Sequence, residues 1–272
     1  MSANIYREQL VVPGDRVISA LDNMSWEAAT AQVNEIGDFI GMGKTNALHQ
    51  RLGTDHAVDT LAENGLYTML DGKYHDIPET VAGLVREATL SGSSLITVHA
   101  SGGERMLEAA IKGRDQGRDQ TRNVFKRADR ERIGGVLGIT VLTSLDGEDC
   151  ESIFGIDKED KDAIKKKVVQ FAYMALDAGL DGIVCSSLEL SAIRANKDFD
   201  DLLTVVPGIT PAFATKATDQ KRTTTAKQAI EQGADLVVIG RAINDAKAYG
   251  LTKAEAAQAV AEEVKEGLAL AA

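Results

Sequence analysis

Short apolar runs rich in valine and isoleucine recur along the chain, and each ends in a polar or glycine-containing step. Near-continuous apolar runs of this kind are typical of parallel strands that are covered on both faces. Eight such runs are present, and we predict that each forms a strand. Their ranges are 17–22, 39–44, 67–73, 95–100, 136–143, 182–187, 204–209 and 236–241.

Amphipathic segments with helical spacing lie between these runs, at 25–37, 77–92, 158–179, 225–233 and 253–271. The first begins with Ser25, a candidate N-cap. Strands that alternate with helices, in a chain of 272 residues, predict a single-domain (β/α)8 TIM barrel of the α/β class. A doubly wound open sheet is the alternative, but it usually has fewer strands, and no GxGxxG motif follows the first run.

The connection after the fourth run is unusually long and carries charges of both signs. We expect an extended, solvated helical segment around 104–133, and a regulatory or partner-binding insert is the alternative. The sequence GRDQ occurs at 113–116 and again at 117–120, but two copies do not make a repeat architecture.

The net charge of −11 argues against nucleic acid and anionic membranes as partners. No run of 18 apolar residues is present, and the first residues lack the pattern of a signal peptide, so we expect a cytoplasmic protein without membrane spans. Its two cysteines fit a reducing compartment.

Charged residues follow the first three runs, where a barrel of this class carries its functional groups. These are Asp22, Lys44, Asp71 and Lys73, with Asp76 in the next loop. Asp71 and Lys73 are two residues apart, so we expect both side chains on one side of a strand. Neighbouring carboxylates would keep Lys73 protonated and make it a candidate general acid. A salt-bridge ring that only ties strand ends together is the alternative.

A second group of candidates lies near the end of the chain. Gly240 and Arg241 end the eighth run, where barrels of this class often bind phosphate. The polar loop at 210–221 is expected to cover a ligand. No metal site is expected, because the carboxylates alternate with lysines. His99 is interpreted as a structural residue.

Several motifs, in order along most of the chain, resemble the orotidine 5′-phosphate decarboxylase family. They are ALD (20–22), DGKYHDIPETV (71–81), VHASGG (98–103), TVLTS (140–144), VCSSLE (184–189), VVPGIT (205–210), DQKR (219–222) and VVIGRAI (237–243). The D-x-K-x-x-D core is shared with sugar-phosphate decarboxylases and synthases of the same suprafamily. The HDIP extension, TVLTS and DQKR are more specific.

The resemblance implies a cofactor-free decarboxylation of orotidine 5′-phosphate to UMP in pyrimidine biosynthesis. It makes Lys73 the proton donor to C6 of the pyrimidine, within a charged network that includes Lys44, Asp71 and Asp76. It also implies a homodimer, in which Asp76 and Thr80 reach into the site of the second subunit.

The resemblance further implies a set of substrate contacts to the ribose, the pyrimidine and the phosphate. They are Asp22, Lys44, Thr80, Thr143, Ser144, Thr210, Gln220, Gly240 and Arg241. Thr210 stands where many bacterial relatives have an arginine, so one phosphate cation is missing, and Gly72 stands where a larger apolar residue is common. Two alternatives stay open: a Mg²⁺-dependent enzyme acting on a sugar phosphate, and a non-catalytic barrel that binds nucleotides.

Overall fold

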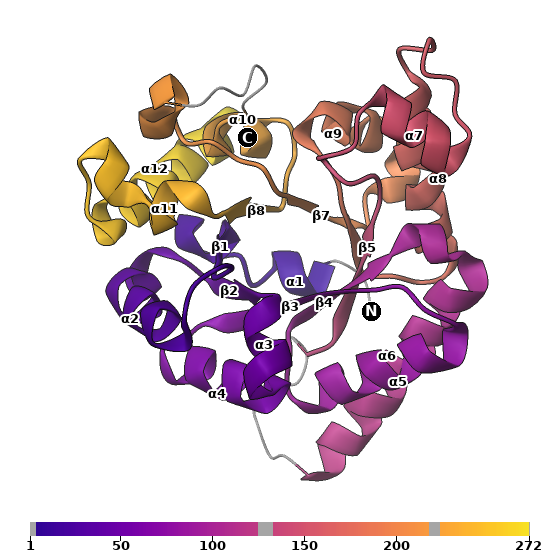
Figure 1. Cartoon of the computed structure of the whole chain (residues 1–272), viewed down its shortest axis with the longest axis horizontal. Helices are drawn as coiled ribbons and strands as arrows, with labels where there is room; N and C mark the ends of the chain where they lie inside the picture. Colours follow the sequence, from indigo (N-terminus) through magenta and orange to yellow (C-terminus); the bar gives the residue numbers. More distant parts are fainter. Residues whose placement is uncertain (1–3, 125–132, 218–223, 272) are drawn as a thin grey trace.

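The computed structural model describes residues 4–124, 133–217 and 224–271. In this part of the chain, eight parallel strands pair in sequence order and close into a barrel, with β8 returning to β1 (Figure 1). The predicted TIM barrel is therefore confirmed. The strands are β1 Val17–Ala20, β2 Met42–Thr45, β3 Tyr67–Tyr74, β4 Leu95–His99, β5 Gly135–Ile139, β6 Gly182–Val184, β7 Leu203–Val206 and β8 Leu236–Ile239.

Helices surround the barrel on all sides (Figure 1). The α-helices are α1 Asn4–Arg7, α2 Trp26–Ile36, α3 Ala47–Leu52, α4 Thr54–Glu63, α5 Pro78–Leu90, α6 Glu104–Val124, α7 Gly147–Phe154, α8 Ala163–Asp177, α9 Ser187–Arg194, α10 Ala226–Glu231, α11 Arg241–Asn244 and α12 Lys253–Ala271. Short 3-10 turns, such as η3 Ala100–Gly102 and η6 Ala212–Ala217, complete several connections.

Side-chain caps define where two of these helices begin. Ser25 Oγ accepts a hydrogen bond from the Ala28 amide at 3.2 Å, which confirms the predicted N-cap of α2. At α10, Thr225 and Gln228 form a reciprocal capping box, with bonds of 3.2 and 3.0 Å. Each cap satisfies backbone donors that have no partner inside the helix.

Strand alternation divides the buried apolar side chains into two cores. One fills the barrel interior and includes Ile18, Met42, Met69 and Leu95. The other, much larger, lies between the strands and the surrounding helices. Because inward and outward positions alternate, the polar residues two positions beyond an interior residue also point toward the barrel axis.

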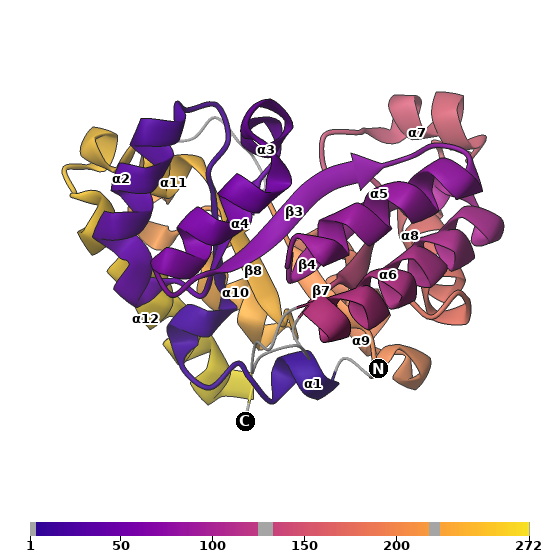
Figure 2. The same ribbon diagram turned by 90° about the horizontal axis from the view of Figure 1, so that it is seen from below.

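The short helix α1 closes the end of the barrel opposite to the end at which β3 finishes (Figure 2). Tyr6 is buried in the interior core. Arg7 holds the helix in place, because its Nε donates to Asp235 Oδ1 at 2.7 Å. Asp235 also accepts a hydrogen bond from Arg194 at 2.6 Å. This end of the barrel is therefore a closed structural face.

The charged connection after β4 forms the long helix α6, but the expectation that it is simply solvated is wrong. Arg114 and Arg118 are buried, and Arg114 forms an ion pair with the buried Asp181 at 2.9 Å. The four-residue spacing of the GRDQ copies places both arginines on one helix face. Residues 125–132 of the predicted segment lie outside the described part of the chain.

The predicted fifth strand, 136–143, is too long, because β5 ends at Ile139. The two neighbouring strands end at the same level, β4 at His99 and β6 at Val184. Without a neighbour on either side the chain leaves the barrel wall. Thr143 and Ser144 consequently lie in an exposed turn rather than at a strand end.

Close packing of α6 against α5 depends on glycines. A side chain at Gly113 would collide with the backbone carbonyl of Ala82, which cannot move alone. We predict that Gly113→Ala lowers the free energy of unfolding by about 1–3 kcal/mol, as overpacking does. Urea denaturation followed by circular dichroism measures the loss. The control is Gln116→Ala, on the exposed face of the same helix, which should change stability by less than about 0.5 kcal/mol. Equal stability of the two variants would contradict the packing argument.

Candidate active site

Strand alternation brings three charged side chains together at the open end of the barrel. Lys44 lies two residues beyond the interior residue Met42, and Asp71 lies two residues beyond Met69. Asp22 follows β1 in the same sense. The neighbouring positions of β1, β2 and β3 therefore direct these side chains toward one another.

The charged groups form a continuous row of ion pairs. Lys44 Nζ lies 2.5 Å from Asp22 Oδ2 and 3.0 Å from Asp71 Oδ2. Lys73 Nζ pairs with the same oxygen, Asp71 Oδ2. One carboxylate oxygen thus bridges two ammonium groups, and the row runs Asp22–Lys44–Asp71–Lys73.

Burial and pairing act in opposite directions on these charges. Burial alone would lower the pKa of Lys44, but Asp71 and Asp22 outweigh it and raise that pKa above its usual value. Burial would likewise raise the pKa of Asp71, but Lys44 and Lys73 hold it below its usual value. Both groups are therefore charged at neutral pH, as the sequence predicted.

The row is graded in exposure. The side chains of Lys44 and Asp71 are only 10% and 8% exposed, whereas that of Lys73 is 38% exposed. Asp22 is partly exposed, and its buried Oδ1 has no hydrogen-bond partner among the described residues. The row thus ends in a reachable ammonium at Lys73 and an unused acceptor at Asp22, which are the two features that a ligand can engage.

Lys73 reaches Asp71 by a different route from the one predicted. The pairing of β3 with β4 shifts between Leu70 and Tyr74, and Lys73 takes a left-handed backbone conformation with φ of 48°. Regular alternation therefore does not set its direction. The ion pair forms as predicted, but through a bulge in β3.

Two polar residues that the sequence analysis did not select also contact Asp71. Thr97 Oγ1 donates to Asp71 Oδ1 at 2.9 Å, and Asn46 Nδ2 donates to the Asp71 carbonyl at 2.7 Å. Thr97 offered one signal, because it is a hydroxyl residue at an inward position, two residues beyond Leu95, in an apolar strand. Nothing in the sequence distinguishes Asn46 from an ordinary loop residue.

Asp76 and Thr80 do not join the row within one chain. Both are exposed, and Asp76 Oδ1 accepts a hydrogen bond from the next amide, that of Ile77, at 2.6 Å. Ile77 itself is 66% exposed although it is a large apolar residue. These three residues therefore present a carboxylate, a hydroxyl and an apolar side chain outward from the loop after β3 and the start of α5.

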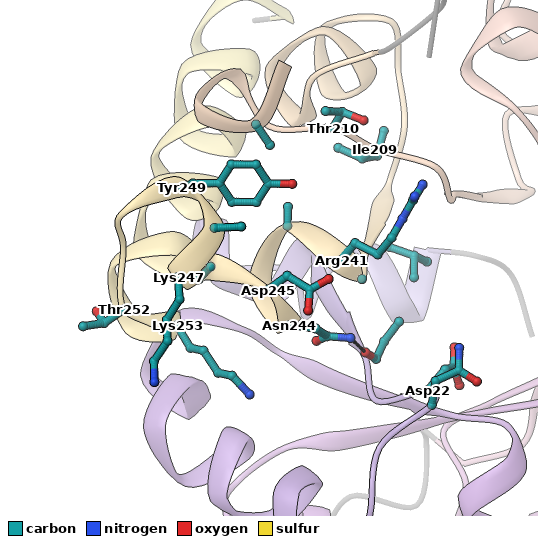
Figure 3. A pocket seen from close by; sticks show the side chains of 18 of the residues that line it. Asp22, Ile209, Thr210, Arg241, Asn244, Asp245, Lys247, Tyr249, Thr252 and Lys253 are labelled. Carbon is teal, nitrogen blue, oxygen red and sulfur yellow. Dashed lines mark hydrogen bonds between the residues drawn. The ribbon is translucent and has the colours of Figure 1, made fainter. Parts of the chain in front are cut away.

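An open pocket adjoins the row and extends along α11 (Figure 3). Its lining includes Asp22, Thr210, Gly240 and Arg241, which the sequence analysis placed at one ligand. The Arg241 side chain is exposed and makes no hydrogen bond or ion pair with the described residues, and Figure 3 shows it extending toward Thr210. An arginine without a partner among the described residues, in the same pocket as Asp22, suits a ligand with an anionic group and hydroxyl groups.

The predicted contacts at positions 143, 144 and 220 have different outcomes. Thr143 and Ser144 lie in the turn after β5 and do not line it. Gln220 lies outside the described residues. The loop that carries it is closed at its base, because Thr210 donates its amide to the Thr224 carbonyl at 3.0 Å.

His99 and His75 lie side by side next to the row, with ring centroids 5.4 Å apart. Burial lowers the pKa of His99, and the neighbouring His75 and Lys73 lower it further. His99 is therefore neutral at pH 7 and adds no charge beside Lys73.

Within the described ranges, no helix is long and apolar enough to cross a membrane. No three histidine, cysteine or acidic side chains of the same residues are grouped so that they could hold a metal ion.

Comparison with known proteins gives this geometry its context. A family model described as "Orotidine 5'-phosphate decarboxylase / HUMPS family" matches residues 15–259. The chain belongs to this family. The match spans β1 to β8, so it includes every strand that contributes to the charged row and its pocket.

Relatives named orotidine 5′-phosphate decarboxylase resemble the chain over most of its length. The protein from Anaeromyxobacter sp. (strain K) is 38% identical over 86% of this chain and 93% of its own length. That from Heliobacterium modesticaldum is 36% identical over 94% and 98%. The crystal structure of orotidine 5′-phosphate decarboxylase from Lactobacillus acidophilus superimposes with a TM-score of 0.73 and 29% identity, covering 92% of this chain and 99% of that chain. The resemblance read from the motifs is therefore confirmed.

The bridging carboxylate should dominate the stability of the site. We predict that Asp71→Asn lowers the free energy of unfolding by about 3 kcal/mol at pH 7, because it leaves a buried ammonium with fewer partners. Urea denaturation of both proteins between pH 3 and pH 10 measures the difference. Glu108→Gln, an exposed carboxylate of α6, is the control and should cost less than about 0.5 kcal/mol.

The same experiment has a defined pH dependence. The folded pKa of Asp71 lies below its ordinary value of 3.8, so its contribution is present above pH 3.8 and is lost as the pH falls through the folded pKa. The folded pKa of Lys44 lies above 10.5, so its contribution persists below pH 10.5 and is lost only above it. The difference between the proteins should therefore be constant from about pH 5 to pH 9 and shrink below about pH 4. A difference that changes near pH 7 would contradict this assignment.

Proposed function

We propose that this chain decarboxylates orotidine 5′-phosphate to UMP in pyrimidine biosynthesis, without a metal or an organic cofactor. The observation that carries the proposal is the row of ion pairs Asp22–Lys44–Asp71–Lys73 beside the pocket that Arg241 borders. The family supports it, because relatives of that name match the chain over nearly their whole length.

Lys73 is the proton donor in this proposal. When the bond to the carboxyl carbon breaks, its electron pair stays on C6 of the pyrimidine, where no adjacent carbonyl delocalises it fully. The Lys73 ammonium, held by Asp71 and 38% exposed, transfers a proton to C6 and is later reprotonated from solvent. The Lys73 ammonium, held in place in advance by Asp71, stabilises the developing negative charge at C6 without rearrangement.

The remaining contacts orient the substrate. The free Oδ1 of Asp22 accepts a hydrogen bond from a ribose hydroxyl, and Lys44 lies beside it. Arg241 provides a fork of donors for the phosphate. Gly240 and Thr210 border the same part of the pocket. Thr210 offers a hydroxyl where many relatives offer a cation, so Arg241 carries more of the phosphate affinity.

Three further residues complete the proposed contacts. Gln220 joins the phosphate site, and Thr143 with Ser144 contacts the pyrimidine, as the family resemblance implies. Binding of the phosphate far from C6 contributes to the rate because that binding energy can be used to align the reacting groups in the transition state.

The functional unit in this proposal is a cytoplasmic homodimer. Asp76 and Thr80 are exposed, and the exposed Ile77 lies between them in sequence. A second subunit that covers this surface would bury Ile77 and receive Asp76 and Thr80 beside its own Lys73. The catalytic set Lys44, Asp71, Lys73 and Asp76 is then complete only in the dimer.

We predict that Lys73→Ala lowers kcat at least about 10³-fold, because it removes the proton donor. Loss of the ultraviolet absorbance of orotidine 5′-phosphate measures turnover, and a circular dichroism spectrum checks the fold. Lys112→Ala, an exposed lysine of α6, is the control and should keep wild-type turnover. The assay is run with and without EDTA.

Each result has a distinct meaning. Near-normal turnover by Lys73→Ala would contradict the proposed role of Lys73. Wild-type activity that EDTA abolishes would favour a Mg²⁺-dependent sugar-phosphate enzyme, which shares the D-x-K-x-x-D core. Binding of UMP by the wild type in calorimetry, without any release of CO₂, would favour the non-catalytic barrel.

Shared sites predict complementation between two inactive variants. Each site takes Lys73 from one subunit and Asp76 from the other. A dimer of one Asp76→Ala subunit and one Lys73→Ala subunit therefore contains one intact site. An equimolar mixture, allowed to exchange subunits, should regain about one quarter of wild-type activity by random pairing. The control is each variant exchanged with itself. A mixture no more active than its components, although mixed dimers are shown by mass spectrometry, would refute the shared site.

A further inference from the structure

The bulge of β3 leaves one backbone donor of Lys73 without a ladder partner. Strands β3 and β4 pair at Leu70 with Ile96 and again at Tyr74 with Val98. Three residues of β3 therefore face the single residue Thr97 of β4. Lys73, the last of these three residues, has a φ of 48°, which is uncommon for a residue with a side chain.

Thr97 occupies the gap and closes a ring of contacts. Its Oγ1 accepts a hydrogen bond from the Lys73 amide at 2.9 Å and donates to Asp71 Oδ1 at 2.9 Å. A hydroxyl has one hydrogen to donate, so accepting from the amide directs that hydrogen to the carboxylate. The other oxygen of this carboxylate, Asp71 Oδ2, forms an ion pair with Lys73 Nζ. The ring joins the backbone of Lys73 to its own ammonium.

The Thr97 side chain is out of reach of solvent. Thr97 is fully buried. On β3 itself, the aromatic ring of Tyr74 covers Gly72 so closely that a side chain there would lie 2.5 Å from Tyr74 Cε1. The absence of a side chain at Gly72 thus allows Tyr74 to pack over the bulge that Thr97 joins to β4.

We propose that Thr97 is a positioning residue for Lys73. Its hydroxyl stabilises the left-handed conformation that directs the ammonium toward Asp71. It also orients the Asp71 carboxylate. Because Thr97 binds Oδ1, the other oxygen, Oδ2, is available to both lysines. This inference rests on the proposed function, in which Lys73 supplies the proton. Thr97 acts through Lys73 and Asp71 and has no contact with the substrate in this scheme.

Thr97→Val tests the proposal, because it removes the hydroxyl and nearly preserves the shape. We expect kcat for orotidine 5′-phosphate to fall roughly 10- to 100-fold through misplacement of the ammonium. KM should change less than about threefold, because Asp22 and Arg241 are untouched. Thr97→Ser, which keeps the hydroxyl, should recover most of kcat.

Thr204→Val is the matched control for the loss of a buried hydroxyl. Thr204 is also a buried strand threonine beside a carboxylate, with its Oγ1 3.2 Å from Asp235 Oδ2, but it lies at the closed end of the barrel. We expect it to lower Tm with unchanged kcat. If Thr97→Val and Thr204→Val lower Tm equally and neither changes kcat, Thr97 is only structural and the proposal is wrong.

Crystal structures of Thr97→Val and Thr97→Ser separate this inference from the proposed function. We expect Lys73 of the valine variant to leave the left-handed region or its ammonium to leave Asp71, and the serine variant to keep both. An unchanged Lys73 in the valine variant would overturn the positioning role. If the wild type does not decarboxylate orotidine 5′-phosphate but the valine variant displaces Lys73, the proposed function fails and the positioning role stands.

Discussion

One carboxylate oxygen, Asp71 Oδ2, binds two ammonium groups at a level of the barrel where burial opposes the charges of Lys44 and Asp71. Asp71 and Asp22 outweigh the effect of burial on the pKa of Lys44, and the two lysines outweigh its effect on the pKa of Asp71. The arrangement is therefore cooperative, and each of its members depends on the strand that delivers it. The barrel provides this, because adjacent parallel strands bring equivalent inward positions to the same level.

The two ends of the barrel show how similar chemistry serves different purposes. At the closed end, Asp235 is bound by Arg7, Arg194 and Thr204, and both of its carboxylate oxygens have partners. At the open end, Asp71 has a comparable set of partners. The open end differs because it also has an oxygen of Asp22 without a partner among the described residues, and because Lys73 is partly exposed. Unused hydrogen-bonding capacity beside a pocket is what separates a binding site from a structural ion-pair network.

The sequence predicted the features that depend on periodicity. The apolar runs located every strand, and the inward parity of Asp71 and Lys44 follows from the same alternation. The alternation of inward and outward positions could not reveal the bulge at which Lys73 takes its left-handed conformation. A bulge depends on how β3 and β4 pair rather than on either strand alone. Thr97 escaped notice for the same reason. The burial of Arg114 also depends on a tertiary partner, Asp181, far away in sequence.

Asp76 alters the charge balance of the proposed site. Within one chain, Lys44 and Lys73 balance Asp22 and Asp71, so the row is neutral and assembles without substrate. A third carboxylate from a partner subunit would make it negative where the carboxylate of the substrate has to lie. That repulsion vanishes as CO₂ departs, whereas the attraction between the Lys73 ammonium and the carbanion grows. The second subunit would therefore lower the difference in free energy between the bound substrate and the transition state, which determines the rate. It would have no such effect on the folding of either barrel.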